Sequence, residues 1–230
     1  FNRVEVDAAV CRYSVLSYLH YITFKYSLLH YSVIHIFCCC WLLFLFYFSV
    51  DVTLDPETAH PELILSDDGK QVRHGDIWQK LPNNSKRFDT YLFVLGKKGF
   101  SSGRFYFEVQ VEGKTSWDLG VAQGSINRKG EILLSPSNGL WTLILRNGNK
   151  YINCSPHVSL PLSVNPQRVG VFVDYEKGLV SFYDVECLFN PVLVITCMYE
   201  FLCKIIAPGL GDTFSLISQS IFSQKIISKL

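Results

Sequence analysis

The sequence predicts an all-β protein, a bent sandwich of two antiparallel sheets, preceded by an apolar N-terminal segment of helical character. Between Gly103 and Ala122 apolar and polar residues alternate on both sides of a two-residue reversal, as in a half-buried hairpin. The dipeptide Asn147-Gly148 is typical of a type I′ hairpin turn. From residue 51 onward short apolar runs recur between turn residues without amphipathic helices, which favours a sandwich.

The predicted strands follow one another along this part of the chain. Each is a short apolar or β-branched run, and the runs are 63–65, 91–95, 105–111, 117–121, 132–134, 140–146, 169–175 and 179–183. The apolar stretch 195–206 is expected to add one edge strand. In the hairpin, residues 105, 107, 109 and 111 should face the core, and residues 106, 108, 110 and 112 a wetter surface.

The N-terminal segment, residues 1–50, is apolar and aromatic, and residues 26–50 contain no Asp, Glu, Lys or Arg. About 20 apolar residues span a bilayer as a helix, so 26–50 is a candidate transmembrane helix. Lys25 and Asp51 bound it, and the positive-inside rule would leave the N-terminus in the cytoplasm. A buried helix and a leader translated from non-coding sequence are the alternatives. Because the chain begins with Phe1 rather than Met, we expect a fragment of a longer protein.

Composition gives little indication of a metal, a cofactor or a nucleic acid. The formal net charge is +1, so the whole chain exerts no strong attraction on polyanions. The eight cysteines show no C-x-x-C spacing, and the six histidines share no metal-ligand spacing. We therefore expect no metal, no cofactor and no nucleic-acid partner.

Two short patterns resemble catalytic motifs. The segment 99–103 fits G-x-S-x-G, but a nucleophile elbow needs a helix after the turn, and here an alternating strand follows. A serine hydrolase, with Ser101 as nucleophile and His157 as the one histidine in the required chain order, is a remote alternative. The segment Gly113-Lys114-Thr115 resembles the end of a P-loop, but Glu108 stands where the first glycine is required. We expect no enzyme.

A series of motifs between residues 51 and 212 resembles the PRY-SPRY domain family, also called B30.2. In chain order these motifs are Val52-Thr53-Leu54-Asp55-Pro56, Arg87-Phe88-Asp89, Tyr106-Phe107-Glu108-Val109, Trp117-Asp118-Leu119-Gly120-Val121-Ala122, Leu145-Arg146-Asn147-Gly148 and Val169-Gly170-Val171-Phe172. The stretch 190–206 departs from the family pattern, although it remains apolar. The resemblance implies a PRY part over 51–100, a SPRY part over 101–214 and a tail over 215–230.

The resemblance also implies a function. Domains of this family stand C-terminally in tripartite-motif ubiquitin ligases, butyrophilins and fish NACHT-type receptors, where they bind partners and do not catalyse. The expected function is therefore that of a cytoplasmic protein-recognition module, the targeting domain of a larger innate-immune or ubiquitin-ligase-type protein. A genuine membrane helix at 26–50 would make that protein single-pass.

Loops at one end of the sandwich are the expected binding site, because they can vary without disturbing the frame. Arg and aromatic side chains contribute much of the binding energy at protein interfaces. The candidates are Arg73, His74, Trp78, Arg87, Phe88, Asn127, Arg128, Lys129, Asn149 and Tyr151. The alternative is a butyrophilin-like sensor of small phosphorylated ligands, which would require convergence of Arg73, His74, Arg87, Arg128, Lys129 and Arg146.

Overall fold

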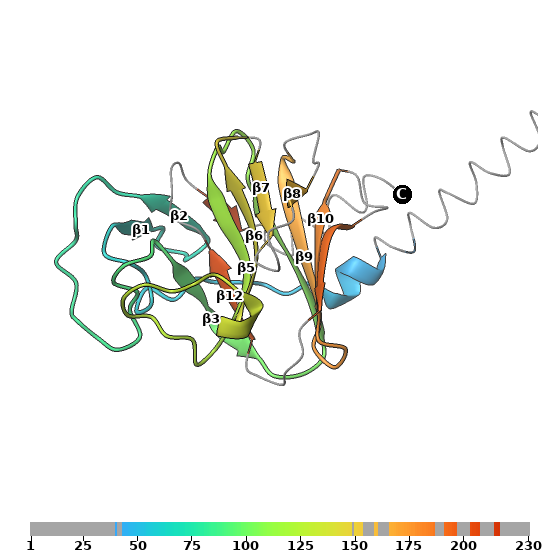
Figure 1. The fold of residues 1–230 in the computed structure, drawn as a ribbon, viewed down its shortest axis with the longest axis horizontal. Coiled ribbons are helices and arrows are strands. Elements are labelled where there is room, and N and C mark those ends of the chain that lie inside the picture. Colours follow the sequence, from blue (N-terminus) through green and yellow to red (C-terminus); the bar gives the residue numbers. More distant parts are fainter. Residues whose placement is uncertain are drawn as a thin grey trace, which may run out of the picture. The chain divides into compact units, whose positions relative to one another are not determined.

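The computed structural model describes residues 40, 43–148, 150–153, 159–160, 166–186, 191–196, 203–207 and 214–216. The chain divides into two units, 1–44 and 45–230, and every strand belongs to the second unit (Figure 1). The elements are β1 (Leu63–Leu65), β2 (Gln71–His74), β3 (Val94–Phe100), β4 (Arg104–Gln110), β5 (Trp117–Gln123), the 3-10 helix η1 (Pro136–Asn138), β6 (Leu140–Arg146), β7 (Lys150–Asn153), β8 (Ser159–Leu160), β9 (Arg168–Asp174), β10 (Leu179–Asp184), β11 (Pro191–Thr196), β12 (Cys203–Ala207) and β13 (Phe214–Leu216).

These strands form two antiparallel sheets. The first has seven strands in the order β1-β2-β13-β4-β9-β10-β11, and the second has six in the order β3-β12-β5-β6-β7-β8. Figure 1 shows β5, β6 and β7 of the second sheet alongside β9 and β10 of the first. The all-β sandwich predicted from the sequence is therefore confirmed.

The core lies between the two sheets and contains the predicted apolar face of the hairpin. Phe105 and Phe107 on β4 belong to the same buried cluster as Trp117 and Leu119 on β5. Strands β9, β10 and β6 contribute the alternating residues Val169, Val171, Val173, Val180, Phe182, Trp141, Leu143 and Leu145. Period-two alternation thus correctly predicted the residues of β4 and β5 that face the core.

The outward side of β4 is less exposed to solvent than predicted. Gln110 and Glu112 are exposed as expected, but Tyr106 and Glu108 are almost fully buried. The segment before the first strand also contacts β4, because the backbone N–H of Val50 donates to the carbonyl of Tyr106 at 2.9 Å. The prediction of a solvent-exposed face was wrong at these two positions, because Tyr106 lies against Gly170 and Glu108 pairs with Arg168. Both contacts come from β9, which is distant in sequence.

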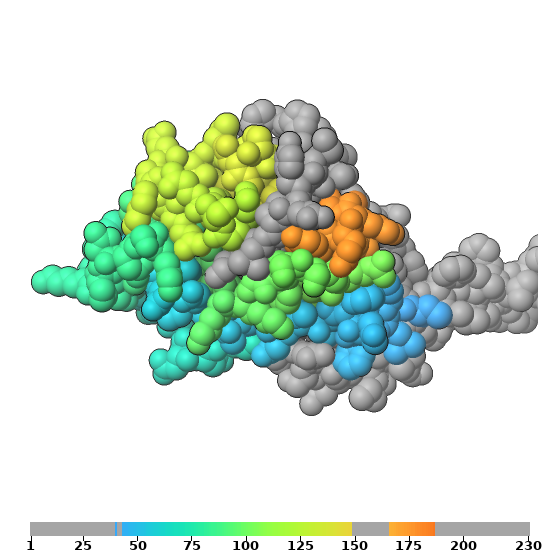
Figure 2. Space-filling model, turned by 90° about the horizontal axis from the view of Figure 1, so that it is seen from below, coloured from blue at the N-terminus to red at the C-terminus, as the bar shows by residue number. Residues whose placement is uncertain are grey.

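The segment 49–54 pairs with one strand of each sheet. Ser49 bridges to Tyr106 on β4, and Leu54 bridges to Gly96 on β3. The N–H of Lys97 donates to the carbonyl of Thr53 at 2.8 Å, which strengthens the second junction. Figure 2 shows the stretch after residue 45, in blue, as a band across one face. These contacts give hydrogen-bond partners to backbone groups of β3 and β4.

The last strands insert between earlier ones. Strand β12 lies between β3 and β5, and β13 lies between β2 and β4. The prediction of one edge strand over 195–206 was therefore wrong: β11 is an edge strand of the first sheet, but β12 is an interior strand of the second. An apolar run alone cannot reveal which strands pair on either side of it.

The apolar run 132–134 forms no strand. Ile132 instead packs in a second buried cluster with Phe88, Phe93 and Leu95, and Leu134 packs against that cluster. Short apolar runs indicate burial more reliably than they indicate strand geometry.

The turn chemistry agrees with the sequence. Asn147 and Gly148 both have positive φ, at 54° and 73°, between β6 and β7. These angles are the ones that an Asn-Gly hairpin turn requires.

The candidate membrane segment 26–50 lies largely outside the described residues. Residues 43–48 are helical. Within the part of the chain that the structure describes, no helix has both the length and the apolar character to cross a bilayer.

Candidate functional site

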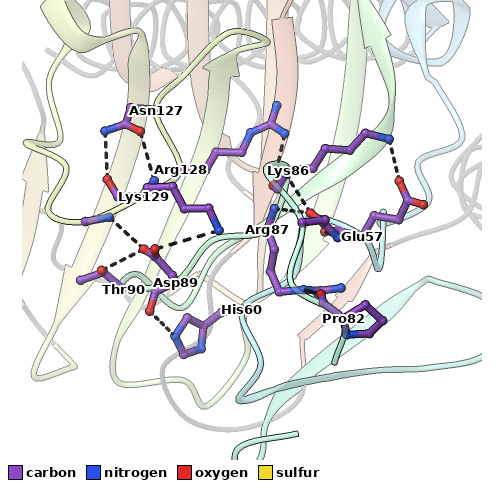
Figure 3. Close-up of polar contacts among 12 residues, drawn as sticks. Glu57, His60, Pro82, Lys86, Arg87, Asp89, Thr90, Asn127, Arg128 and Lys129 are labelled. Carbon is purple, nitrogen blue, oxygen red and sulfur yellow. Dashed lines mark hydrogen bonds and ion pairs between the residues drawn. The ribbon is translucent and has the colours of Figure 1, made fainter. Parts of the chain in front are cut away.

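Three loops, 55–62, 75–91 and 124–134, are tied to one another by polar contacts (Figure 3). The first precedes β1, the second joins β2 to β3, and the third follows β5. Most of these contacts run from a side chain to a backbone carbonyl or N–H of another loop. Such hydrogen bonds between loops let irregular segments hold a defined shape without strand pairing.

Arg87 is at the centre of this arrangement. Its Nη1 donates to the carbonyl oxygens of Pro56 at 2.9 Å and Ala59 at 2.6 Å, and its Nε donates to that of Pro82 at 3.4 Å. The side chain is buried, with 7% of the residue exposed. The expectation that Arg87 contacts a partner directly is corrected, because its guanidinium group instead joins two loops.

Phe88 requires the same correction. It is fully buried and packs edge-on against Phe93, with ring centroids 5.7 Å apart. Its backbone N–H donates to the carbonyl of Thr58 at 3.0 Å. Phe88 therefore anchors the 75–91 loop to the second hydrophobic cluster and presents no side chain at the surface.

His60 joins the first two loops. Its Nε2 lies 3.2 Å from the carbonyl oxygen of Asp89, and its Nδ1 accepts the backbone N–H of Glu62 at 3.2 Å. The ring is also edge-on to the indole of Trp78, with centroids 5.0 Å apart and an interplanar angle of 79°. Burial lowers the pKa of His60, because a charged imidazole would lose its hydration.

The third loop is shaped largely by its own polar residues. Arg128 donates from Nη2 to the carbonyl of Gly124 at 2.8 Å and from Nη1 to that of Lys86 at 3.2 Å. Asn127 bonds to both backbone groups of Lys129. Asn127, Arg128 and Lys129 lie in a loop as predicted, and their contact with a partner stays a prediction.

Asp89 connects the second loop to the third. The backbone N–H of Gly130 donates to its Oδ1 at 2.8 Å, and Lys129 Nζ lies 4.0 Å from its Oδ2. The bond from Gly130 lowers the pKa of the Asp89 carboxyl, because the N–H favours the charged form.

Loop 75–91 also exposes apolar side chains. Ile77 is 77% exposed, Trp78 54% and Leu81 38%, and we call these three residues the Trp78 surface. On the 124–134 loop Leu133 is 73% exposed. Ile77 and Leu81 were not among the candidates. The Ile77-Trp78 pair, within a loop of polar and turn residues, is a sequence signal that could have identified Ile77.

The other candidates lie elsewhere or outside the described side chains. Arg73 and His74 belong to strand β2 rather than to a loop, and His74 Nε2 pairs with Glu62 Oε2 at 3.1 Å. Tyr151 belongs to β7, so its assignment to a loop was wrong. Asn149 lies outside the described residues.

Arg73 is exposed at a surface hollow of about 340 Å³. The residues that line this hollow all lie on or next to the β1–β2 hairpin; they are Ile64, Leu65, Ser66, Gln71, Val72 and Arg73.

The geometry does not favour the phosphate-sensor alternative. Arg87 is committed to three carbonyls, and Arg146 pairs with Asp118 at 2.7 Å. Burial raises the pKa of Asp118, while Arg146 opposes that shift. These cations have partners within the chain, so they form no vacant cluster for a phosphate.

Ser101 lies in the connection between β3 and β4, and a strand follows it. This is not the strand, turn and helix of a nucleophile elbow. The remote hydrolase alternative therefore gains no support from the local fold.

The described structure is thus a two-sheet antiparallel sandwich with three loops joined by hydrogen bonds. The chain matches the model of the SPRY-associated domain, PRY, over residues 52–100, and that of the SPRY domain over residues 104–206. It belongs to the PRY-SPRY family, which confirms the resemblance found in the motifs.

Two human relatives agree with this assignment. The chain is 51% identical over 142 residues to human butyrophilin subfamily 2 member A2, covering 61% of this chain and 27% of that protein. It is 50% identical over 139 residues to the human E3 ubiquitin-protein ligase TRIM58, covering 60% of this chain and 29% of the ligase. The chain therefore spans under a third of the length of these relatives.

A solved structure supports the fold. The crystal structure of the TRIM65 PSpry domain superposes with a TM-score of 0.66 at 22% sequence identity. The superposition covers 75% of this chain and 92% of that chain.

The buried position of Arg87 leads to a testable expectation. We expect Arg87→Ala to lower the free energy of unfolding by about 2–3 kcal/mol, because three carbonyl oxygens lose their donor. Urea denaturation would measure this. The control is Arg73→Ala, whose exposed side chain should matter by less than about 0.5 kcal/mol. Equal stability of the two variants would contradict a structural role for Arg87.

Proposed function

We propose that this chain is the protein-recognition module of a larger protein and that it binds its partner through the Trp78 surface. PRY-SPRY domains are interaction modules, and the chain matches parts of a butyrophilin and of a ubiquitin ligase. The proposal extends to a cytoplasmic targeting role in an innate-immune or ubiquitin-ligase-type protein. Any ligase chemistry would belong to a different part of that protein.

The exposure of Trp78 is the observation that carries the proposal. Trp78 is 54% exposed, which leaves amphipathic surface in water that partner binding would remove. Ile77 and Leu81 extend the same loop surface with apolar area. Tryptophan is among the residues that most often dominate binding energy at protein interfaces.

The contacts that hold the Trp78 loop in place also support binding through the Trp78 surface. The loop that carries Trp78 is anchored by buried Phe88 and by the carbonyl contacts of Arg87. His60 contacts the indole directly. A pre-positioned anchor loses less conformational entropy on binding than a mobile one, so more of its contact energy appears as affinity.

The experiment is a matched binding comparison. The full chain would be used to isolate a partner, and the dissociation constant would then be measured with that partner purified. We expect Trp78→Ala to weaken binding by about 30-fold or more, which corresponds to roughly 2 kcal/mol. Its melting temperature should stay within about 2 °C, because the side chain is half exposed.

Glu112→Ala, an exposed position in the β4–β5 turn, is the control and should bind like the unmodified chain. If Trp78→Ala and an Ile77→Ser/Leu81→Ser variant both bound with unchanged affinity, the assignment of the binding surface would be wrong.

A further inference from the structure

We propose that His60 is a positioning residue for the Trp78 surface, and that protonation of its imidazole releases the indole of Trp78. The surface would then be ordered near neutral pH and disordered in acid. The consequence for partner binding rests on the proposed function, whereas the effect on Trp78 does not.

Every polar group of His60 has a hydrogen-bond partner within the chain. Its backbone N–H donates to the carbonyl of Phe93 at 3.1 Å, and its carbonyl accepts the N–H of Leu63 at 2.9 Å. Its ring bonds to the carbonyl of Asp89 and to the N–H of Glu62, each at 3.2 Å. Only 3% of the residue is exposed, so water cannot readily replace any of these partners.

These partners determine the protonation state of the ring. Nδ1 faces a backbone N–H, which can only donate, so Nδ1 must be the unprotonated acceptor. Nε2 faces a carbonyl oxygen, which can only accept, so Nε2 must carry the proton. The neutral tautomer protonated at Nε2 is therefore the form that satisfies both contacts.

Protonation would place two donors against each other. Nδ1–H would then face the N–H of Glu62, and that hydrogen bond would be lost. The ring would have to turn or move, and the edge-on contact with Trp78 depends on its present position. Trp78 is half exposed, and hydrogen bonds from the neighbouring Gln79 to the carbonyls of Pro61 and Leu63 hold its backbone. The edge-on contact with His60 is the ring contact described for its indole.

The charged groups around His60 act in both directions. Glu62 on the same loop and Asp89 on the next loop favour the imidazolium, while His74 on β2 opposes it when charged. Lys129 lies 4.0 Å from the Asp89 carboxylate and offsets part of its charge. Burial has the largest effect and lowers the pKa of His60 below the usual 6.5.

The sign of the pH dependence follows from this direction. The unfolded chain binds a proton at His60 more readily than the folded chain does. The contribution of His60 to stability is therefore present above pH 6.5 and is lost as the pH falls through the lower pKa of the folded state.

The test uses the full chain labelled with 5-fluorotryptophan and followed by fluorine NMR from pH 7.5 to about pH 4.5. The Trp78 resonance is assigned with Trp78→Phe. We expect this resonance to shift with a midpoint below 6.5, while those of Trp117 and Trp141, both buried in the core, remain unchanged. Those two resonances report global unfolding, so an acid-unfolded sample is recognised.

Two variants show whether His60 or His74 causes the titration of Trp78. His60→Asn keeps an acceptor near the Nδ1 position and should abolish the titration of Trp78, whereas His74→Asn should preserve it. A Trp78 resonance that does not titrate, that titrates equally in His60→Asn, or that moves only together with the core tryptophans would overturn the proposal.

Partner binding gives an independent readout. We expect affinity to fall in acid for the unmodified chain and to change less with pH in His60→Asn. If Trp78 titrates as expected but Trp78→Ala binds normally, the positioning role stands and the proposed binding surface fails.

Discussion

Gly120→Ala is expected to lower the free energy of unfolding by more than about 4 kcal/mol, or to prevent folding. A Cβ at this position would lie 2.0 Å from the carbonyl oxygen of Trp141 and 2.8 Å from the Cα of Thr142. Both atoms are backbone atoms of β6, which pairs with β5 in the six-stranded sheet. No side chain can rotate away to relieve this clash, so the two strands would have to separate.

A second glycine supplies the control. Gly113 has a φ of 73° but nothing within 4 Å of the Cβ position, so Gly113→Ala should cost only about 1–2 kcal/mol of backbone strain. Urea unfolding followed by near-ultraviolet circular dichroism would compare the two variants. If Gly120→Ala were no less stable than Gly113→Ala, that result would contradict the close approach of β5 and β6 at Gly120.

Arg168→Met is expected to destabilise the chain by about 3–5 kcal/mol. Arg168 Nη1 pairs with Glu108 Oε2, and Nη2 pairs with Glu186 Oε1 at 2.6 Å. The side chains of Arg168 and Glu108 are only 8% and 2% exposed. Tyr106 also donates to Glu108, at 3.0 Å, but a neutral hydroxyl cannot replace a guanidinium charge. Removing Arg168 would leave a buried carboxylate without its cation.

Two further variants test whether this cost comes from the remaining charge. The double variant Glu108→Leu/Arg168→Met should recover most of the lost stability, because neither charge is then buried alone. Lys86→Met removes an ion pair of 2.6 Å in which both side chains are 60% exposed, so it should change stability little. Equal effects of Arg168→Met and Lys86→Met on the urea midpoint would contradict the importance of the buried pair.

Local patterns were sufficient for most strands and turns. The alternation in β4 and β5 correctly predicted Phe105, Phe107, Trp117 and Leu119 as core residues. Positive φ at Asn147 agreed with the expected turn. These features depend on neighbours in sequence, because strand pleating alternates side chains and turns require particular φ values.

The candidate site was only partly predictable. Trp78 is exposed in its loop as expected, but Arg87 and Phe88 are buried. A loop position and a residue type cannot reveal burial when the covering groups lie far away in sequence. Arg87 is buried by contacts with Pro56 and Ala59 on a separate loop.

The sequence by itself determined the all-β class, the main hairpins and the membership of the PRY-SPRY family. Only the tertiary structure decided that β12 and β13 insert between earlier strands, that the 49–55 segment pairs with strands of both sheets, and that His60 contacts Trp78. The physical reason is the range of the interactions. Periodicity and turn preferences act between neighbouring residues, whereas strand order and side-chain burial depend on backbone and apolar contacts between distant segments.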